Sequence, residues 1–225
     1  MFYGGDESLT SLAWIDEHVR KNHGPLGAFY PEKTSTNRNP HGALKEGDTP
    51  AWFYFYLNGL NDPAHPDFGG WGGRYAFNGK FWQDTPDTVA GHTSPRATVY
   101  RWRPAFQNEF AARLDWCVKD FRGANHAPVI KIKGELQRNA KPGETVTLAA
   151  SATDPDGNAL TYKWWQYADA DSADTTVAIA RSDSSNRASF VVPKEPGKQV
   201  HVILEVTDNG TPSLTSYQRI IYNIR

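Results

Sequence analysis

The stretch LTYKWWQY, residues 160–167, decides the fold of the second half of this chain. Its side chains alternate between two faces: Leu160, Tyr162 and Trp164 on one, and Thr161, Lys163, Trp165 and Tyr167 on the other. Such period-two alternation is typical of a β-strand that buries one face. The pattern predicts that Trp164 lies in a hydrophobic core and that Trp165 and Tyr167 lie on the opposite face.

Further segments on either side of this stretch alternate in the same way, with turn-forming residues between them. They are residues 145–152, 189–192, 200–206 and 218–224. Short alternating strands at regular spacing predict an all-β immunoglobulin-like sandwich over residues 127–225. The sequence has 1 Cys, Cys117, which excludes an internal disulfide. Hydrophobic packing must therefore hold the two sheets together.

Residues 1–124 have a different pattern, in which helices are joined by long loops. Apolar spacing and capping residues predict helices over residues 8–22, 48–56 and 104–121. The loop over residues 61–99 is rich in Gly, Pro, Asp and aromatic residues, and no strand-rich region is evident. Because three helices and so long a loop make a poor independent domain, we interpret residues 1–124 as the C-terminal part of a larger α/β domain. The fold class is then α+β and multi-domain.

Composition excludes several classes of function. The net charge is -1 with both signs mixed along the chain, which argues against a nucleic-acid surface. The longest apolar run, residues 51–60, is too short to cross a bilayer, so no membrane partner is expected. The first six residues have neither the basic nor the apolar region of a signal peptide.

The glycine-rich loop DFGGWGGRY, residues 67–75, is a candidate sugar-binding surface. Glycines let the backbone turn tightly and expose a flat ring, so Trp71 can stack on a sugar, with Tyr75 and Trp82 as further aromatic contacts. Asp67 and Arg74 can bond sugar hydroxyls. The alternative is that Trp71 points inward and closes the first domain.

Trp165 and Tyr167 form a second candidate surface, because residues two apart on a strand lie about 7 Å from each other. That spacing suits stacking on neighbouring sugars of a chain. The alternative is that both rings face the first domain, since exposed apolar patches often mark a partner.

Two turn sequences, residues 151–158 and 206–210, carry carboxylates that form a candidate calcium site. Asp154, Asp156 and Asp208 offer the oxygen ligands that Ca²⁺ prefers. The alternative is that Asp, Asn, Pro and Gly are present there for turn geometry alone.

Five strings stand out in the first half: EGDTPA at 46–51, NGLNDP at 58–63, GWGGR at 70–74, RWR at 101–103 and FQNEFAAR at 106–113. Together they resemble one bacterial family, the Sde182-type cellulose-binding proteins. The resemblance implies a nucleoside hydrolase-like main domain followed by an immunoglobulin-like domain. Nucleoside hydrolases hold calcium with an early aspartate cluster and a late His-Asp element. Asp48 matches the late aspartate, so it is a candidate calcium ligand or a helix cap, whereas Gly47 stands where the histidine is expected.

Three expectations for function follow, the first two of them from the resemblance. The first is a secreted, periplasmic or cell-surface protein that binds polysaccharide or oligosaccharide and is not catalytic in this chain. The second is the rear part of a calcium-dependent glycoside or nucleoside hydrolase, whose aspartate cluster lies upstream of Met1. The third is a docking or dimerising unit, present as a homodimer.

Overall fold

The protein is described here by a computed structural model, which covers residues 4–32, 49–183 and 185–225. The contacts between residues divide the chain into two compact units. The boundary between them lies after His126, so that most of the first unit precedes it and most of the second unit begins at Ala127. Two short segments, Asn58–Leu60 and Gly210–Leu214, each belong to the unit on the other side of this boundary. Asn58–Leu60 belongs to the second unit, and Gly210–Leu214 belongs to the first.

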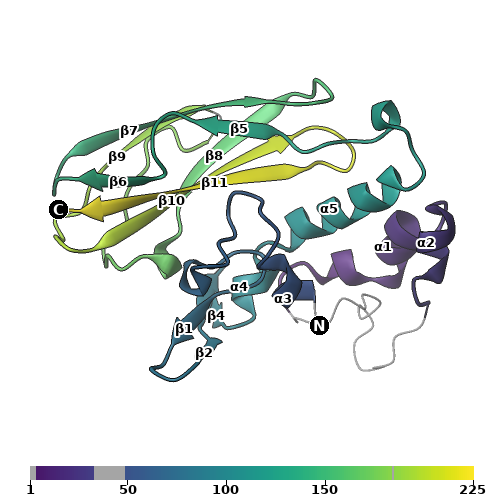
Figure 1. Cartoon of the computed structure of the whole chain (residues 1–225), viewed down its shortest axis with the longest axis horizontal. Coiled ribbons are helices and arrows are strands. Elements are labelled where there is room, and N and C mark those ends of the chain that lie inside the picture. Colours follow the sequence, from purple (N-terminus) through teal and green to yellow (C-terminus); the bar gives the residue numbers. More distant parts are fainter. Residues whose placement is uncertain (1–3, 33–48, 184) are drawn as a thin grey trace. The chain divides into compact units, whose positions relative to one another are not determined.

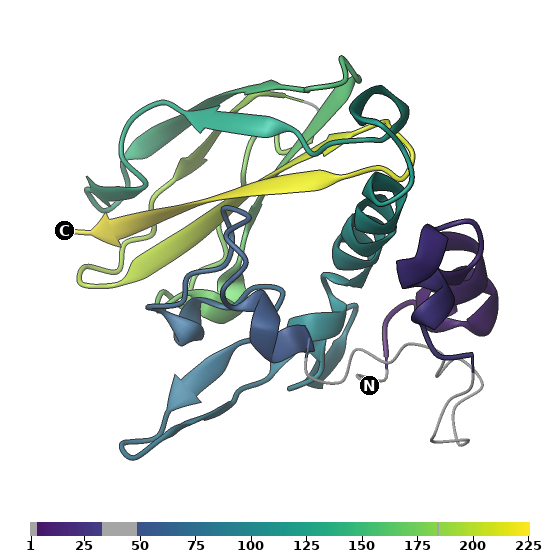
Figure 2. The same cartoon turned by 45° about the vertical axis from the view of Figure 1, so that its right-hand side comes forward.

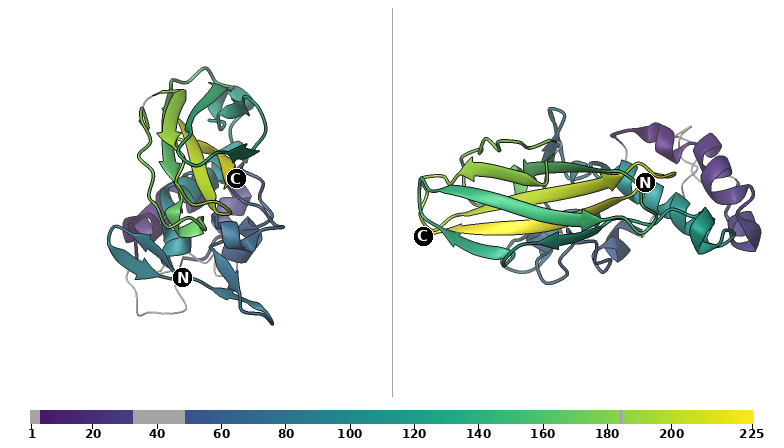
Figure 3. Two further views of the ribbon diagram at one scale, coloured as in Figure 1. Left: turned by 90° about the vertical axis from the view of Figure 1, so that its left-hand side faces the viewer. Right: turned by 90° about the horizontal axis from the view of Figure 1, so that it is seen from above.

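Within the described residues, the strands of the second unit form two sheets that lie one over the other (Figures 1 and 3). The strands are β5 (Val129–Ile132), β6 (Gln137–Ala140), β7 (Thr145–Thr153), β8 (Leu160–Gln166), β9 (Arg187–Val191), β10 (Gln199–Asp208) and β11 (Thr215–Ile224). One sheet has the order β6-β11-β10-β8 and the other β5-β7-β9. Neighbouring strands are antiparallel except β6, which runs parallel to β11.

The core of the second unit takes side chains from both sheets. Leu148 of β7, Trp164 of β8 and Leu204 of β10 have at most 1% of their surface exposed and belong to one hydrophobic cluster. The prediction that Trp164 lies in the core is confirmed. The strands predicted from alternation are present, whereas β5 and β6 were not predicted.

An additional segment pairs with one part of β11. Tyr217 donates its backbone N–H to the carbonyl of Asn58 at 3.2 Å, and Arg219 donates to the carbonyl of Gly59 at 3.1 Å. Gly59 has φ +84°, a conformation that favours glycine. Asn58–Leu60 therefore extends the four-stranded sheet, which the sequence pattern did not predict.

The first unit contains short helices before its long helix α5 (Figure 2). Its described helical segments are η1 (Glu7–Thr10), α1 (Leu12–Ile15), η2 (Asp16–Arg20), α2 (Gly24–Phe29), α3 (Thr49–Phe53), η3 (Pro66–Phe68), α4 (Ala97–Tyr100), α5 (Arg103–Trp116) and η4 (Phe121–Gly123).

The predicted helix over residues 8–22 is present only in part. Residues Glu7–Thr10 form the separate turn η1, and α1 and η2 continue without a gap from Leu12 to Arg20. Asp6 caps η1 and Ser11 caps α1 by accepting from the backbone N–H of Trp14. Ile15 and Val19 nevertheless face the core with Leu114 of α5, as their spacing predicted. The long helix ends at Trp116, five residues before its predicted end, because Asp120 caps the separate turn η4 by bonding the N–H of Gly123.

The long loop over residues 61–99 contains strands, contrary to the prediction. Two antiparallel hairpins form there: β1 (Tyr75–Phe77) with β2 (Trp82–Asp84), and β3 (Asp87–Val89) with β4 (His92–Ser94). Figure 2 shows β1–β2 as an extended ribbon with its turn at one end. In the described part of the chain, no helix is long and apolar enough to cross a membrane.

Candidate functional site

The hairpin β1–β2 is shaped by its turn, residues 78–81. Asn78 accepts hydrogen bonds on Oδ1 from the backbone N–H groups of Lys80 and Phe81, both at 3.0 Å. Gly79 has φ +93°, a conformation that glycine adopts without strain. The turn therefore fixes which residues of the two strands face each other.

One face of this hairpin gathers aromatic rings. Tyr75 lies opposite Asp84, and Phe77 lies opposite Trp82. The Phe77 and Trp82 ring centroids are 5.6 Å apart, with 52° between the ring planes. Phe77 is 57% exposed and Trp82 45% exposed. We call Tyr75, Phe77, Trp82 and Asp84 the hairpin face. Large apolar groups exposed together mark a contact surface.

Tyr75 anchors the hairpin face to the rest of the first unit. Its ring is partly buried, 5.6 Å from the ring of Tyr54. The Tyr54 hydroxyl can donate to the carbonyl of Pro66 or of Gly73, each at 3.0 Å. Burial raises the pKa of Tyr75 above its ordinary value, and the negative charge of Asp84 raises it further. The Tyr75 hydroxyl thus remains protonated at neutral pH.

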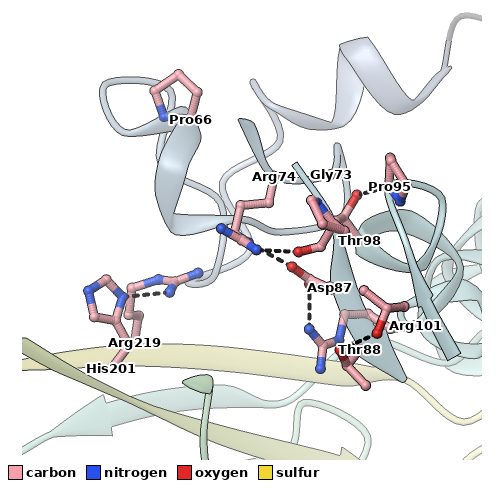
Figure 4. A network of polar contacts seen from close by, with 12 residues as sticks. Pro66, Gly73, Arg74, Asp87, Thr88, Pro95, Thr98, Arg101, His201 and Arg219 are labelled. Atoms are coloured by element: carbon pink, nitrogen blue, oxygen red, sulfur yellow. Dashed lines mark hydrogen bonds and ion pairs between the residues drawn. The ribbon is translucent and has the colours of Figure 1, made fainter. Parts of the chain in front are cut away.

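A buried ion network lies at the base of both hairpins (Figure 4). Asp87 is fully buried and accepts from Arg74 Nε at 2.6 Å and from Arg101 Nη1 at 2.5 Å. Arg74 also donates to the carbonyl of Pro86 at 2.5 Å. The guanidinium of Arg74 therefore holds the loop together, and its predicted role as a group that bonds sugar hydroxyls stays a prediction.

Trp71 is buried, with 2% of its surface exposed. It packs edge-on against Phe53 at 5.5 Å and lies 5.6 Å from Tyr56. The side chain of Asn61 holds this loop in place. Its Oδ1 accepts a hydrogen bond from the backbone N–H of Trp71, and its Nδ2 donates to the backbone carbonyls of Phe53 and Tyr56. The prediction that Trp71 is an exposed stacking ring is corrected in favour of the alternative, that it closes the domain.

The neighbouring glycines explain why Trp71 can be buried there. A Cβ on Gly70 would lie 2.1 Å from Asn61 Oδ1, and one on Gly72 would lie 2.6 Å from the carbonyl oxygen of Pro50. The glycines therefore allow the backbone of the loop to approach α3 closely. They do not serve to expose a ring.

Trp165 and Tyr167 lie on the face opposite Trp164, with ring centroids 5.4 Å apart. Tyr167 is fully buried and lies under the guanidinium of Arg219 at 5.5 Å. This burial corrects the prediction that Tyr167 stacks on a sugar. Trp165 is partly buried, and both of its predicted roles, sugar contact and domain interface, remain predictions.

Asp171 follows the turn η5 (Ala168–Ala170) in the second unit. Its carboxylate accepts from the backbone N–H of His201 and from Gln166 Nε2, both at 2.6 Å. Burial raises the pKa of Asp171 to about 6, although these hydrogen bonds and the charge of Arg219 oppose the change. An aspartate in an unfolded chain has a pKa near 3.9, so the folded state binds this proton more tightly.

The Asp171→Asn variant should therefore respond differently to acid. Above pH 6 the ionised carboxylate opposes folding, and this cost disappears as the pH falls from about 6 to about 4. We expect the parent chain to gain about 2 kcal/mol of unfolding free energy relative to Asp171→Asn over that window. Urea titrations at pH 4, 5, 6 and 7 measure the difference. Asp156→Asn, in an exposed turn of the same unit, is the control, and an equal pH response of parent and Asp171→Asn contradicts the expectation.

The predicted calcium ligands can be placed only in part. Asp48 lies outside the described residues. Asp154 Oδ1 accepts from the backbone N–H groups of Asp156 and Asn158, both at 2.9 Å, as turn geometry requires. Asp208 is 4% exposed. Among residues 4–32, 49–183 and 185–225, no group of three His, Cys, Asp or Glu side chains is arranged to hold a metal ion. Calcium binding stays a prediction.

The structure thus brings some predicted sugar-contact residues together and separates others. Tyr75 and Trp82 share the hairpin face, and Asp67 is exposed on η3. The sequence interpretation missed Phe77 and Asp84. Asn78-Gly79 between aromatic-rich segments predicts a hairpin. A loop of Asn78 and Gly79 would pair Phe77 with Lys80, however, so the pairing of Phe77 with Trp82 follows only from the observed register.

Two family models match the chain, one in each half. Residues 2–75 match the nucleoside hydrolase-like domain of cellulose-binding Sde182, and residues 145–224 match the C-terminal domain of the cellulose-binding protein Sde0182. The chain therefore joins nucleoside hydrolase-like sequence to a C-terminal module of carbohydrate-associated proteins. It belongs to the Sde0182 family of cellulose-binding proteins, as its sequence strings indicated.

One solved structure agrees with this assignment. A nucleoside hydrolase-related hypothetical protein from Saccharophagus degradans, associated with carbohydrate metabolism, is 31% identical with a TM-score of 0.78. The alignment covers 100% of this chain and 55% of that protein, so this chain spans about half its length. The mixed fold of helices and strands is thus shared with that protein.

Two other similarities are too weak to carry an argument. A mouse clustered protocadherin, PcdhgC3 EC1-3, is 24% identical with a TM-score of 0.29, and the alignment covers 48% of this chain and 36% of the protocadherin chain. Domains 4 and 5 of the S-layer protein SbsC are 16% identical with a TM-score of 0.25, and the alignment covers 43% of this chain and 46% of the SbsC chain. No curated protein matches the chain.

Proposed function

We propose that this protein binds polysaccharide, cellulose or a related plant glycan, through the hairpin face and without catalysis by this chain. The observation that carries the proposal is the exposed pair Phe77 and Trp82 on adjacent strands. Membership in a cellulose-binding family supports the class of ligand.

The chemistry of the hairpin face suits a sugar. Sugar rings present patches of C–H groups, which pack favourably on the electron-rich faces of aromatic rings. Hydroxyl groups at the ring edges need hydrogen-bonding partners. The Tyr75 hydroxyl and the exposed Asp84 carboxylate lie on the same face and offer them. The hairpin face therefore combines stacking with polar contacts.

The proposal includes an accessory role for the second unit and a location outside the cell. An immunoglobulin-like sandwich is part of this proposal, and the grouping of β5, β7 and β9 in one sheet and β6, β8, β10 and β11 in the other supports it. Such modules are common on cell-surface proteins. A polysaccharide ligand of plant origin is met outside the cell, in secreted, periplasmic or surface positions. Homodimer formation stays a prediction.

Replacing Trp82 by Ala is expected to weaken binding about tenfold or more. Stacking of one aromatic ring contributes about 1–3 kcal/mol in comparable stacked complexes, and about 1.4 kcal/mol is tenfold in affinity. Affinity electrophoresis in gels that contain soluble cellulose derivatives or xylan measures the loss, and Trp82→Phe should retain part of the retardation.

The matched control is Trp52→Ala, because Trp52 is 68% exposed in α3 but lies outside the hairpin face. It should keep the retardation of the parent chain. Near-ultraviolet circular dichroism of each variant verifies that the fold persists. If no polysaccharide retards the parent chain, the proposal is rejected. If Trp52→Ala and Trp82→Ala lose the same amount of retardation, the hairpin face is not the contact surface.

A second candidate function follows from the match of residues 2–75 to a nucleoside hydrolase-like domain. In that case the whole protein hydrolyses a glycosyl bond with calcium, and this chain supplies its rear part. Release of reducing sugar from nucleosides in the presence of Ca²⁺ favours the hydrolase, whereas retention on polysaccharide without such release favours binding.

A further inference from the structure

We infer that the hairpin face binds single, neutral glycan chains in preference to the flat surface of crystalline cellulose. This inference rests on the proposed function and specifies its ligand. It is carried by the angle between two rings, by the rigidity of the hairpin that holds them, and by the charge beside them.

The rings of Phe77 and Trp82 are tilted by 52° at a centroid separation of 5.6 Å. Two rings lie flat against one plane only when their own planes nearly coincide. A crystal face presents its sugars in one plane, so it can stack on one of these rings but not on both. A single chain is free to rotate about its linkages and can present successive sugars at different angles.

The hairpin keeps this tilt in place. Phe77 and Trp82 are direct partners in the β1–β2 register, so the backbone fixes their separation. Two-stranded ribbons twist more strongly than the strands of larger sheets, which turns cross-strand side chains away from a common plane. Asn78 further restrains the end of the ribbon by bonding Gln83 Oε1 from Nδ2 at 3.0 Å. Bringing the two ring planes together would require Phe77 or Trp82 to leave its side-chain rotamer, or the ribbon to change its twist.

Polar groups on the hairpin favour a chain whose edges are accessible. Sugars in a crystal face bond their edge hydroxyls to neighbouring chains, whereas a single chain offers these hydroxyls to the protein. Asp84 is exposed beside Tyr75 and accepts such bonds. Arg74, the nearest cation in sequence to Tyr75, is held by buried Asp87. Lys80 is exposed in the turn, outside the paired strands, whereas Asp84 lies on the hairpin face. An acidic chain of uronates on that face would therefore meet a carboxylate of like charge, which disfavours it.

The first experiment compares retention on acid-swollen amorphous cellulose and on microcrystalline cellulose, per unit of accessible surface. We expect at least about tenfold stronger retention on the amorphous form, because the crystal face uses only one of two rings. Soluble cellohexaose should release the chain from the amorphous form, and Trp82→Ala should lose most of the difference. Equal retention on the two forms, or no release by cellohexaose, overturns the inference. No retention on any polysaccharide instead rejects the proposed function.

The second experiment tests charge with two soluble polymers, neutral hydroxyethyl cellulose and acidic polygalacturonate. The parent chain should be retarded by the neutral polymer and at least about fivefold less by the acidic one at low ionic strength. Asp84→Asn should narrow this gap, while Asp67→Asn, an exposed aspartate on η3, should not. Stronger retardation by polygalacturonate in the parent chain overturns the neutral part of the inference.

Discussion

Replacing Asp87 by Asn should lower the free energy of unfolding by about 3–5 kcal/mol, the range seen when one partner of a buried ion pair is removed. Asp87 is fully buried and accepts hydrogen bonds from both Arg74 and Arg101. An amide is neutral and turns one donor toward the two guanidinium groups. The negative charge that both partly buried guanidinium groups contact would then be lost.

Urea unfolding of the parent chain and the variant, followed by tryptophan fluorescence, measures the loss. Asp67→Asn is the matched control, because Asp67 is exposed on η3 of the same unit, and its stability should change by less than about 0.5 kcal/mol. The Asp87 network also holds the strands that begin the two hairpins. Polysaccharide retention by Asp87→Asn should therefore fall together with stability. A loss below 1 kcal/mol would show that the two arginines are stabilised by other groups.

Alternation along the strands made most of the second unit predictable. Residues 200–206 and 218–224 alternate because one face of each strand packs in a dry core, and the structure places Val202, Leu204 and Ile220 there. β5 and β6 have four residues each, which is too short for alternation to stand out from chance. Their position depends on pairing with β7 and β11, and this is a property of the whole fold.

The first unit was less predictable because local signals there have more than one physical cause. Glycines at 70 and 72 can expose a neighbouring ring or admit a close backbone contact, and only the positions of Asn61 and Pro50 decide between them. A capping serine can stand at Ser8 or at Ser11, and apolar spacing is similar for both. The hairpin face was partly predictable, since Tyr75 and Trp82 were identified, but its second exposed ring, Phe77, depends on the β1–β2 register.

The segment Asn58–Leu60 raises a question that sequence patterns do not address, namely how much the second unit depends on it. Arg219 donates to the carbonyl of Leu60 from Nη2 at 3.2 Å and to His201 Nδ1 from Nη1 at 3.0 Å. Because arginine is always the donor, His201 accepts at Nδ1 and carries its proton on Nε2. Together with the backbone bonds from β11 to Asn58 and Gly59, these contacts indicate that the segment is bound along the edge of β11 and supports the sheet.

Gly59→Ala should therefore destabilise the second unit by about 3 kcal/mol. The new Cβ would lie 1.9 Å from the carbonyl oxygen of Tyr217, which is a backbone atom and cannot move aside cheaply. The positive φ of +84° adds about 1 kcal/mol, and displacement of the segment removes two backbone hydrogen bonds of about 1 kcal/mol each. Hydrogen exchange at the amides of Tyr217 and Arg219, with urea unfolding, measures both effects.

Gly197→Ala separates strain from displacement, because Gly197 also has φ +84° in the same unit but has open space around its Cβ position. This control should lose only about 1 kcal/mol and leave exchange at Tyr217 and Arg219 unchanged. The difference between the two variants, about 2 kcal/mol, is then the contribution of Asn58–Leu60 to the sheet. If the two variants lose the same stability and both keep slow exchange at these amides, the segment does not support the sheet, and the second unit folds without help from the first half of the chain.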